Sequence, residues 1–144
     1  MWSRSTILIC DKVICDSELK IEGYNLYSNE LSGKGRGVAL YVKQEVRCNL
    51  LYVDSKYDDF VVLQIDSGVD EKLLIGIFYR SPNNSPESDE EFFSLMNQVC
   101  SKFNSKKILV GDFNFTHIDW ASVTSTRSSC SMCNKFVDIL QKFF

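Results

Sequence analysis

Short apolar runs alternate with polar, turn-forming segments through the first half of the chain. Runs that are rich in β-branched and aromatic residues, and that are bounded by charged or glycine-containing turns, are typical of β-strands. This half is therefore predicted to be mostly β. The runs cover residues 6–10, 24–27, 37–43, 50–53, 60–65 and 73–79.

The pattern changes to a helical period after residue 84. Ser85 and Pro86 suit the start of a helix, and Ser88 with Glu91 fits a capping box. A second helical pattern closes the chain at residues 133–143. The apolar positions with helical spacing are Phe92, Leu95, Met96, Val99 and Phe103 in the first helix, and Cys133, Phe136, Val137, Leu140 and Phe143 in the second.

A fully apolar strand at residues 108–110 lies between the two predicted helices. The order of β-rich segment, helix, strand and helix implies a mixed α/β layered fold in which helices cover sheets. The chain has 144 residues, no internal repeat and no proline-rich linker. We therefore expect one domain over residues 1–144.

Composition narrows the class of protein only modestly. A hydrophobic content of 44% is that of a globular protein, and the net charge of −3 counts mildly against a sequence-independent DNA-binding module. A nuclease can nevertheless hold a phosphodiester through a metal and a few local donors. The sequence has no secretory signal and no membrane-spanning run, which predicts a soluble intracellular protein with six reduced cysteines.

Two strand ends carry candidate chemistry. The predicted strand at residues 108–110 leads into Gly111 and then Asp112 and Asn114, two residues apart, which extended backbone would place on one face. A carboxylate beside a carboxamide suits the orientation of a water or the binding of a metal or phosphate. An ordinary polar turn explains the same residues about equally well.

The second strand end is residues 78–84. Tyr79 offers a hydroxyl and Arg80 a guanidinium, and both groups suit a phosphate. A strand followed by a proline turn is again an equally good reading of this segment on its own.

Taken together, these segments carry a family resemblance. The chain resembles the endonuclease domain of non-LTR retrotransposons, within the endonuclease/exonuclease/phosphatase superfamily, over nearly its whole length and in the same order. The segments that carry the resemblance are residues 16–24, 37–43, 78–83, 111–114 and 115–120.

The resemblance implies a truncated four-layer α/β sandwich and hydrolysis of phosphodiesters with Mg²⁺, here with DNA as the substrate and the nucleus as the place of action. It also implies the roles of the site residues. Asp112 would orient or activate the attacking water, Asn114 would hold that water and the phosphate, and Tyr79 would contact the phosphoryl group. Arg80 is a weaker candidate for a further phosphate contact.

The sequence departs from the family's pattern at both ends. The family has a metal-binding Glu ahead of the segment that matches residues 16–24, and residues 6–10 hold none, with Asp11 a poor substitute. The family's later Asp and Ser-Asp-His segments have no counterpart, and the lone His117 is not expected to be a general base. We therefore expect an incomplete metal site and little activity from this chain alone.

Other interpretations stay open. A non-catalytic α/β module that binds a phosphate or a partner is the main alternative, and a conceptual translation of a decayed element is a third. Two further motifs give little support to a function. The basic loop at residues 33–37 lacks the spacing of a P-loop, and the pair Cys130 and Cys133 lacks partners for zinc.

Overall fold

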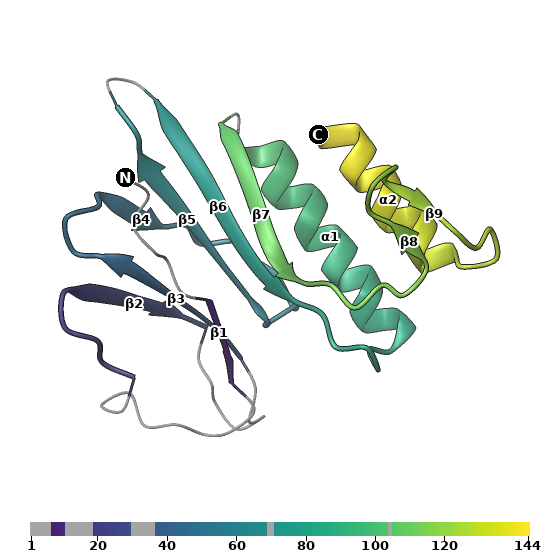
Figure 1. The fold of residues 1–144 in the computed structure, drawn as a ribbon, viewed down its shortest axis with the longest axis horizontal. Helices are drawn as coiled ribbons and strands as arrows, with labels where there is room; N and C mark the ends of the chain where they lie inside the picture. The colour runs from purple at the N-terminus through teal and green to yellow at the C-terminus, as the bar shows by residue number, and fades with distance from the viewer. Residues whose placement is uncertain (1–6, 11–18, 30–36, 69–70, 104) are drawn as a thin grey trace.

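The computed structural model describes residues 7–10, 19–29, 37–68, 71–103 and 105–144. These ranges form two larger β-sheets, a small hairpin and two helices (Figure 1). The elements are β1 (Ile7–Cys10), β2 (Tyr24–Ser28), β3 (Gly37–Lys43), β4 (Cys48–Leu50), β5 (Phe60–Asp66), β6 (Lys72–Tyr79), α1 (Pro86–Lys102), β7 (Lys106–Asp112), β8 (Ile118–Asp119), β9 (Thr124–Ser125) and α2 (Ser131–Phe143).

The two larger sheets differ in strand direction. The first has the order β1-β3-β2 and is antiparallel throughout. The second has the order β4-β5-β6-β7, in which β6 and β7 are parallel and the other pairs are antiparallel. Helix α1 connects the two parallel strands, as such a connection usually requires.

One apolar core lies between the two sheets. Alternate residues of a strand point to opposite faces, so β3, β5 and β6 each send every second side chain into this layer. Its buried residues are Val38, Leu40, Val42, Val61, Leu63 and Ile77.

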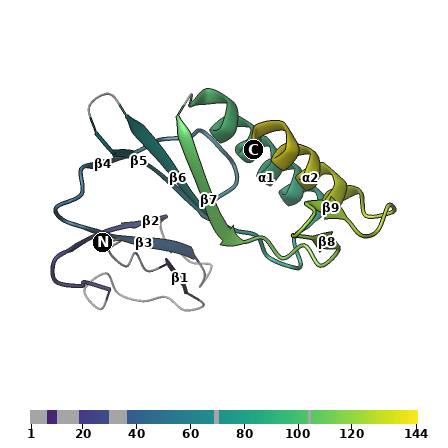
Figure 2. The ribbon, with the colours of Figure 1, turned by 45° about the horizontal axis from the view of Figure 1, so that its top comes forward.

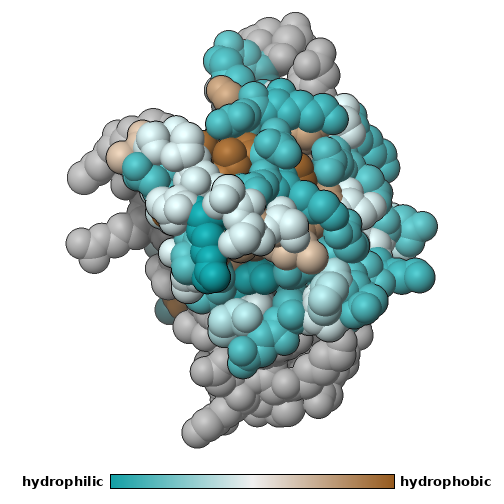
Figure 3. Space-filling model, turned by 90° about the vertical axis from the view of Figure 1, so that its right-hand side faces the viewer, coloured by the Kyte–Doolittle hydropathy of each residue, from teal (hydrophilic) through white to brown (hydrophobic). Residues whose placement is uncertain are grey.

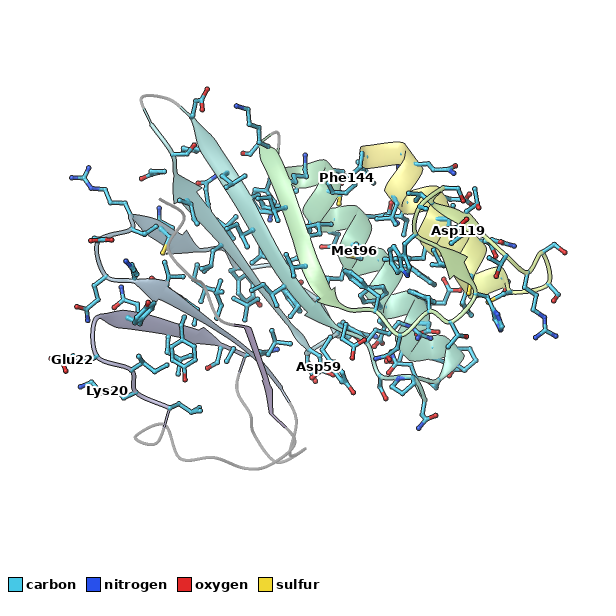
Figure 4. The ribbon with its side chains drawn as sticks, in the orientation of Figure 1. Lys20, Glu22, Asp59, Met96, Asp119 and Phe144 are labelled. Carbon is cyan, nitrogen blue, oxygen red and sulfur yellow. The ribbon has the colours of Figure 1, made fainter. Side chains whose placement is uncertain are left out.

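A second and larger core lies between the other face of β4-β5-β6-β7 and the helices. Phe92 of α1 is fully buried at its centre, and it packs edge-on against Phe78 of β6 and lies beside Phe136 of α2. Met96, which points into the same core, is labelled in Figure 4. The apolar faces predicted for the two helices therefore cover a sheet.

The described residues thus form three layers: sheet, sheet and helices. Figures 1 and 2 both show α1 and α2 together on one face of β4-β5-β6-β7. This is the predicted α/β sandwich, and the described part of the chain supplies three of the four expected layers, without a helix on the outer side of β1-β3-β2.

Some local predictions were wrong. Strand β4 covers Cys48–Leu50, because the chain then leaves the sheet and buries Val53 beside Tyr57 against the helices. Helix α1 is capped by Ser85, whose hydroxyl accepts the Ser88 N–H at 3.2 Å, and not by the predicted capping box. The hairpin of β8 and β9 was not predicted, because two-residue strands give no periodic signal.

The outer side of the helix layer is mostly polar. Figure 3 shows this face as largely hydrophilic, with a small hydrophobic area near its centre. In the described part of the chain, no helix is both long enough and apolar enough to cross a membrane.

Candidate active site

The carboxyl ends of β6 and β7 bring two predicted site residues together. The parallel register pairs Tyr79 with Asp112 as the last partners of the two strands. Registered neighbours point to the same face, and here this is the face of Ile75 and Ile77, toward the first sheet. Asp59, labelled in Figure 4, lies at the same end, and its carbonyl accepts the Tyr79 N–H at 2.9 Å.

Gly111 allows the two strands to approach at this end. A Cβ atom at Gly111 would lie 2.0 Å from the carbonyl oxygen of Phe78, a backbone atom that cannot move aside. Glycine is therefore required where the backbones come this close. The ladder continues one step beyond the strands, because the Arg80 N–H donates to the Asp112 carbonyl at 2.8 Å.

Asn114 lies beside Tyr79 and Asp112, but an extended backbone, which the sequence predicted, does not place it there. Strand β7 ends at Asp112, and Asn114 has a left-handed backbone with φ of 50°, so the argument from extended spacing does not apply to it. Its position is fixed by its side chain, whose Nδ2 donates to the Arg80 carbonyl at 2.8 Å. Asparagine tolerates this conformation better than most residues.

Arg80 is held inside the protein. Only 7% of it is exposed, and its guanidinium forms a bidentate ion pair with Asp89 of α1, with Nε to Oδ1 at 2.8 Å and Nη2 to Oδ2 at 2.7 Å. Its Nη1 donates to the carbonyls of Phe113 and Asn114 at 3.4 and 3.1 Å. A phosphate contact by Arg80 stays a prediction that these internal contacts do not support.

Solvent reaches the three residues predicted to be catalytic. Asp112 is exposed, and Tyr79 and Asn114 are partly buried. The Asn114 carboxamide uses one N–H on the protein and retains a second N–H and the Oδ1 acceptor. The site therefore offers a carboxylate, a carboxamide and a phenol to a water or a phosphate oxygen.

The described residues do not by themselves fit a Mg²⁺ site. Mg²⁺ prefers a near-octahedral set of oxygen ligands. Asp112 and Asn114 supply such oxygens, but no group of three or more His, Cys, Asp or Glu that could hold a metal occurs among the residues the structure describes. Asp11 lies outside the described residues, as does most of the basic loop at residues 33–37.

Three residues that the sequence did not suggest lie behind the site and hold its backbone. They are Tyr57, Asn84 and Asp89. The Tyr57 hydroxyl donates to the Tyr79 carbonyl at 2.7 Å, and burial raises the pKa of Tyr57 to about 12. The amide of Asn84 donates to Asp89 at 3.2 Å and lies 3.5 Å from the Tyr57 hydroxyl. The sequence shows Asp89 only as an ordinary acidic residue in the first turn of a helix, and its need for a partner follows from its burial in the structure.

His117 and the two clustered cysteines lie outside this constellation. His117 is in a turn before β8, where its carbonyl accepts the Thr126 N–H at 2.9 Å. Cys130 is the N-cap residue of α2, and Cys133 is buried in the larger core, where burial raises the pKa of its thiol to about 11. Cys48, Cys100, Cys130 and Cys133 are free thiols.

Comparison with known proteins agrees with this arrangement. The family model described as "Endonuclease-reverse transcriptase" matches residues 73–143, which include both strand ends. The fold is similar to the endonuclease domain of TRAS1, a telomere-specific non-LTR retrotransposon, with a TM-score of 0.62 and 16% identity. The described residues have a fold of the endonuclease/exonuclease/phosphatase type, and the chain resembles the endonucleases of non-LTR retrotransposons.

A second solved structure is also similar in fold. It is a D. rerio TDP2 humanized by 14 mutations, with a TM-score of 0.52 and 16% identity. The matches cover 85% and 86% of this chain but 53% and 58% of the TRAS1 and TDP2 chains, so the chain spans little more than half of either. No curated protein matched the sequence.

Proposed function

We propose that this chain is part of a Mg²⁺-dependent DNA endonuclease domain and supplies the residues that contact the water and the scissile phosphate. The observation that carries the proposal is the pairing of Tyr79 with Asp112 at the ends of adjacent parallel strands, with Asn114 next to them. Ligands commonly bind at the carboxyl ends of strands in α/β sheets.

Each residue has a role that its chemistry permits. The exposed Asp112 carboxylate orients the attacking water and accepts its proton as the water oxygen bonds to phosphorus. The phosphorus–oxygen bond to the departing sugar oxygen breaks in the same displacement, and that oxygen takes a proton from solvent. The free N–H of Asn114 donates to a phosphate oxygen while its Oδ1 holds the water. The Tyr79 hydroxyl donates to the phosphoryl group, on which negative charge develops in the transition state.

Mg²⁺ enters the proposal through the family resemblance alone. Further ligands would have to come from outside the described residues, so we expect the 144-residue chain to cleave slowly or not at all by itself. We also propose that residues 1–144 belong to one domain, of which they form a part, and that DNA is cleaved in the nucleus.

The main alternative is a non-catalytic module that binds a phosphate or a partner. The observation in its favour is the small number of metal ligands among the described residues. Under this alternative, the three polar residues bind a phosphate or a partner without cleaving a phosphodiester, so the chain shows no nicking that requires Mg²⁺.

The test combines DNA binding with nicking. In EDTA, a fluorescent duplex should bind Asp112→Asn about threefold to tenfold more tightly than the wild type, because the substitution removes a negative charge beside the phosphate. Asn114→Ala should bind the duplex more weakly. Asp138→Asn, an exposed position on α2, is the matched control and should leave the affinity unchanged.

Nicking of a supercoiled plasmid then separates the two functions. Any nicking that requires Mg²⁺ should disappear in Asp112→Ala. The proposal fails if the wild-type chain neither nicks nor binds the duplex, or if Asp112→Asn and Asp138→Asn change the affinity equally.

A further inference from the structure

We propose that Arg80 and Asp89 are positioning residues: their buried ion pair holds the backbone of residues 112–114 and thereby aims Asp112 and Asn114. This inference rests on the proposed function for its catalytic meaning, but the geometry it concerns can be tested without any cleavage. It assigns Arg80 a role inside the protein in place of a contact with phosphate.

The pair is built as a fixed junction between α1 and the strand ends. The side chains of Arg80 and Asp89 are 8% and 4% exposed, and two parallel N–H to oxygen contacts join them. Such a bidentate arrangement fixes orientation as well as distance. Removal of two charges from water is costly, so a buried pair is weak evidence for stability and better explained by a need for one specific geometry.

Arg80 contacts three consecutive residues of the site loop. Its backbone N–H donates to the Asp112 carbonyl, and its Nη1 reaches the carbonyls of Phe113 and Asn114. Its own carbonyl accepts the Asn114 side chain at 2.8 Å. The loop is thus tied to one residue from both its backbone and its side chain.

These contacts explain how Asn114 keeps an unfavourable backbone. A non-glycine residue with φ of 50° persists only where its surroundings determine the conformation. Here the carbonyl of Asn114 is held by the guanidinium, and its amide is held by the Arg80 carbonyl. Without these two contacts, the loop could relax and turn the carboxamide away from Asp112.

Two further contacts complete the junction. The guanidinium carbon of Arg80 lies 4.2 Å from the ring centre of Phe115, which places the cation over an aromatic face. Asn84 bridges Asp89 to the Tyr57 hydroxyl, and that hydroxyl holds the Tyr79 carbonyl. Both strand ends are therefore connected to the same ion pair.

The guanidinium has little capacity left for a ligand. Of its five N–H groups, four are accounted for by the bonds to Asp89, Phe113 and Asn114. A phosphate would have to displace these partners and leave a buried carboxylate unpaired, which is strongly unfavourable.

The test is an NMR comparison of the full chain with Arg80→Lys, Asp89→Asn and the control Arg127→Lys. Arg127 is exposed, and its guanidinium donates to the nearby hydroxyl of Ser129. Lysine keeps the charge but cannot bridge to the loop carbonyls. We expect both site variants to shift the Asn114 side-chain amide and the backbone amides of residues 112–115. Val38 and Val42, in the other core, should not shift, and the control should change none of these signals.

The inference is overturned if Arg80→Lys folds and the Asn114 side-chain amide keeps its wild-type resonances, or if the shifts spread equally to Val38 and Val42. If Arg80→Lys does not fold, Asp89→Asn decides by the same criteria, because it retains the side-chain volume and one oxygen acceptor.

A DNA titration distinguishes this role from a phosphate contact. In EDTA, Arg80→Gln, which removes the charge that lysine keeps, should leave the salt dependence of duplex binding unchanged, because no phosphate contact is lost. If the slope of log affinity against log salt concentration falls by about one, Arg80 instead contacts a phosphate of the DNA. The NMR result stands even where no nicking or DNA binding occurs, so failure of the inference and failure of the proposed function are separate outcomes.

Discussion

Gly111 illustrates how a single residue sets the geometry of the site. It is the partner of Phe78 in the parallel ladder, directly before Asp112, and any side chain at this position would meet the Phe78 carbonyl. The close approach of β6 and β7 at their carboxyl ends therefore depends on the absence of a side chain at residue 111.

Gly111→Ala should destabilise the protein by about 2 kcal/mol or more, because the backbones must separate to admit a methyl group. Urea unfolding followed by circular dichroism measures the change. Gly68→Ala is the control, because a Cβ there meets nothing within 4 Å and should leave the midpoint nearly unchanged. Equal midpoints for the two variants would contradict the role given to Gly111.

Tyr57 should make stability depend on alkaline pH. Its pKa is raised from 10.0 to about 12 in the folded protein, chiefly by burial, so the folded state favours the neutral phenol. A raised folded pKa contributes stability that is fully present below pH 10 and is lost as the pH rises toward 12. The loss should be about 2 kcal/mol.

The measurement compares urea unfolding of the wild type and Tyr57→Phe between about pH 8 and pH 11.5. Phenylalanine cannot titrate, so the wild type should lose stability relative to the variant as the pH rises. Below pH 10, the wild type should be the more stable, because only it donates to the Tyr79 carbonyl. A difference that stays constant with pH would show that Tyr57 titrates normally.

Among the secondary-structure elements, α1 connects the site to the core. Its first turn carries Asp89, and its buried face carries Phe92 and Met96. The Ser85 cap fixes where this helix begins, and so where the aspartate stands relative to Arg80.

Ser85→Ala should destabilise the protein by about 1 kcal/mol, since the Ser88 N–H loses its acceptor at the helix start. Ser94→Ala is the control, because Ser94 is exposed within the same helix and alanine is the better helix former there. Thermal or urea unfolding gives the comparison. If Ser94→Ala is the more destabilised of the two, the assigned cap is wrong.

Much of this element structure could be predicted from the sequence, because burial imposes its period on long elements. The continuous apolar run at residues 37–43 predicts a buried strand, and the helical spacing of Phe92, Met96 and Val99 predicts a buried helix face. The hairpin of β8 and β9 left no such pattern. Its short strands depend on contacts that a sequence does not display.

The site was predictable only in part. Tyr79 and Asp112 follow apolar strands, and parallel pairing of those strands brings them together. The left-handed backbone of Asn114 and the internal role of Arg80 depend on Asp89 and on the carbonyls of residues 112–114. Those partners are distant in sequence or belong to the backbone, so residue type alone pointed to a phosphate.

At the scale of the whole molecule, the face of β7 that turns toward the first sheet is the surface that we expect to govern self-association. Ile108 and Val110 lie on this face, and they are 42% and 37% exposed. In the described part of the chain, β7 is also the end strand of its sheet, with β6 as its hydrogen-bonded neighbour. An apolar strand with an open edge is a template for pairing with another copy.

We therefore expect the 144-residue chain to self-associate as its concentration rises, through apolar contact and edge pairing at β7. Replacement of both Ile108 and Val110 by lysine should suppress the association, because charge on an edge strand opposes pairing. Sedimentation velocity over a range of protein concentrations measures the effect. Ile21→Lys, at a residue that is 45% exposed outside β7, is the control and should associate like the wild type. If the control and the double variant lose association together, general surface charge is responsible; if only the double variant does, the contact lies at β7, directly beside Asp112.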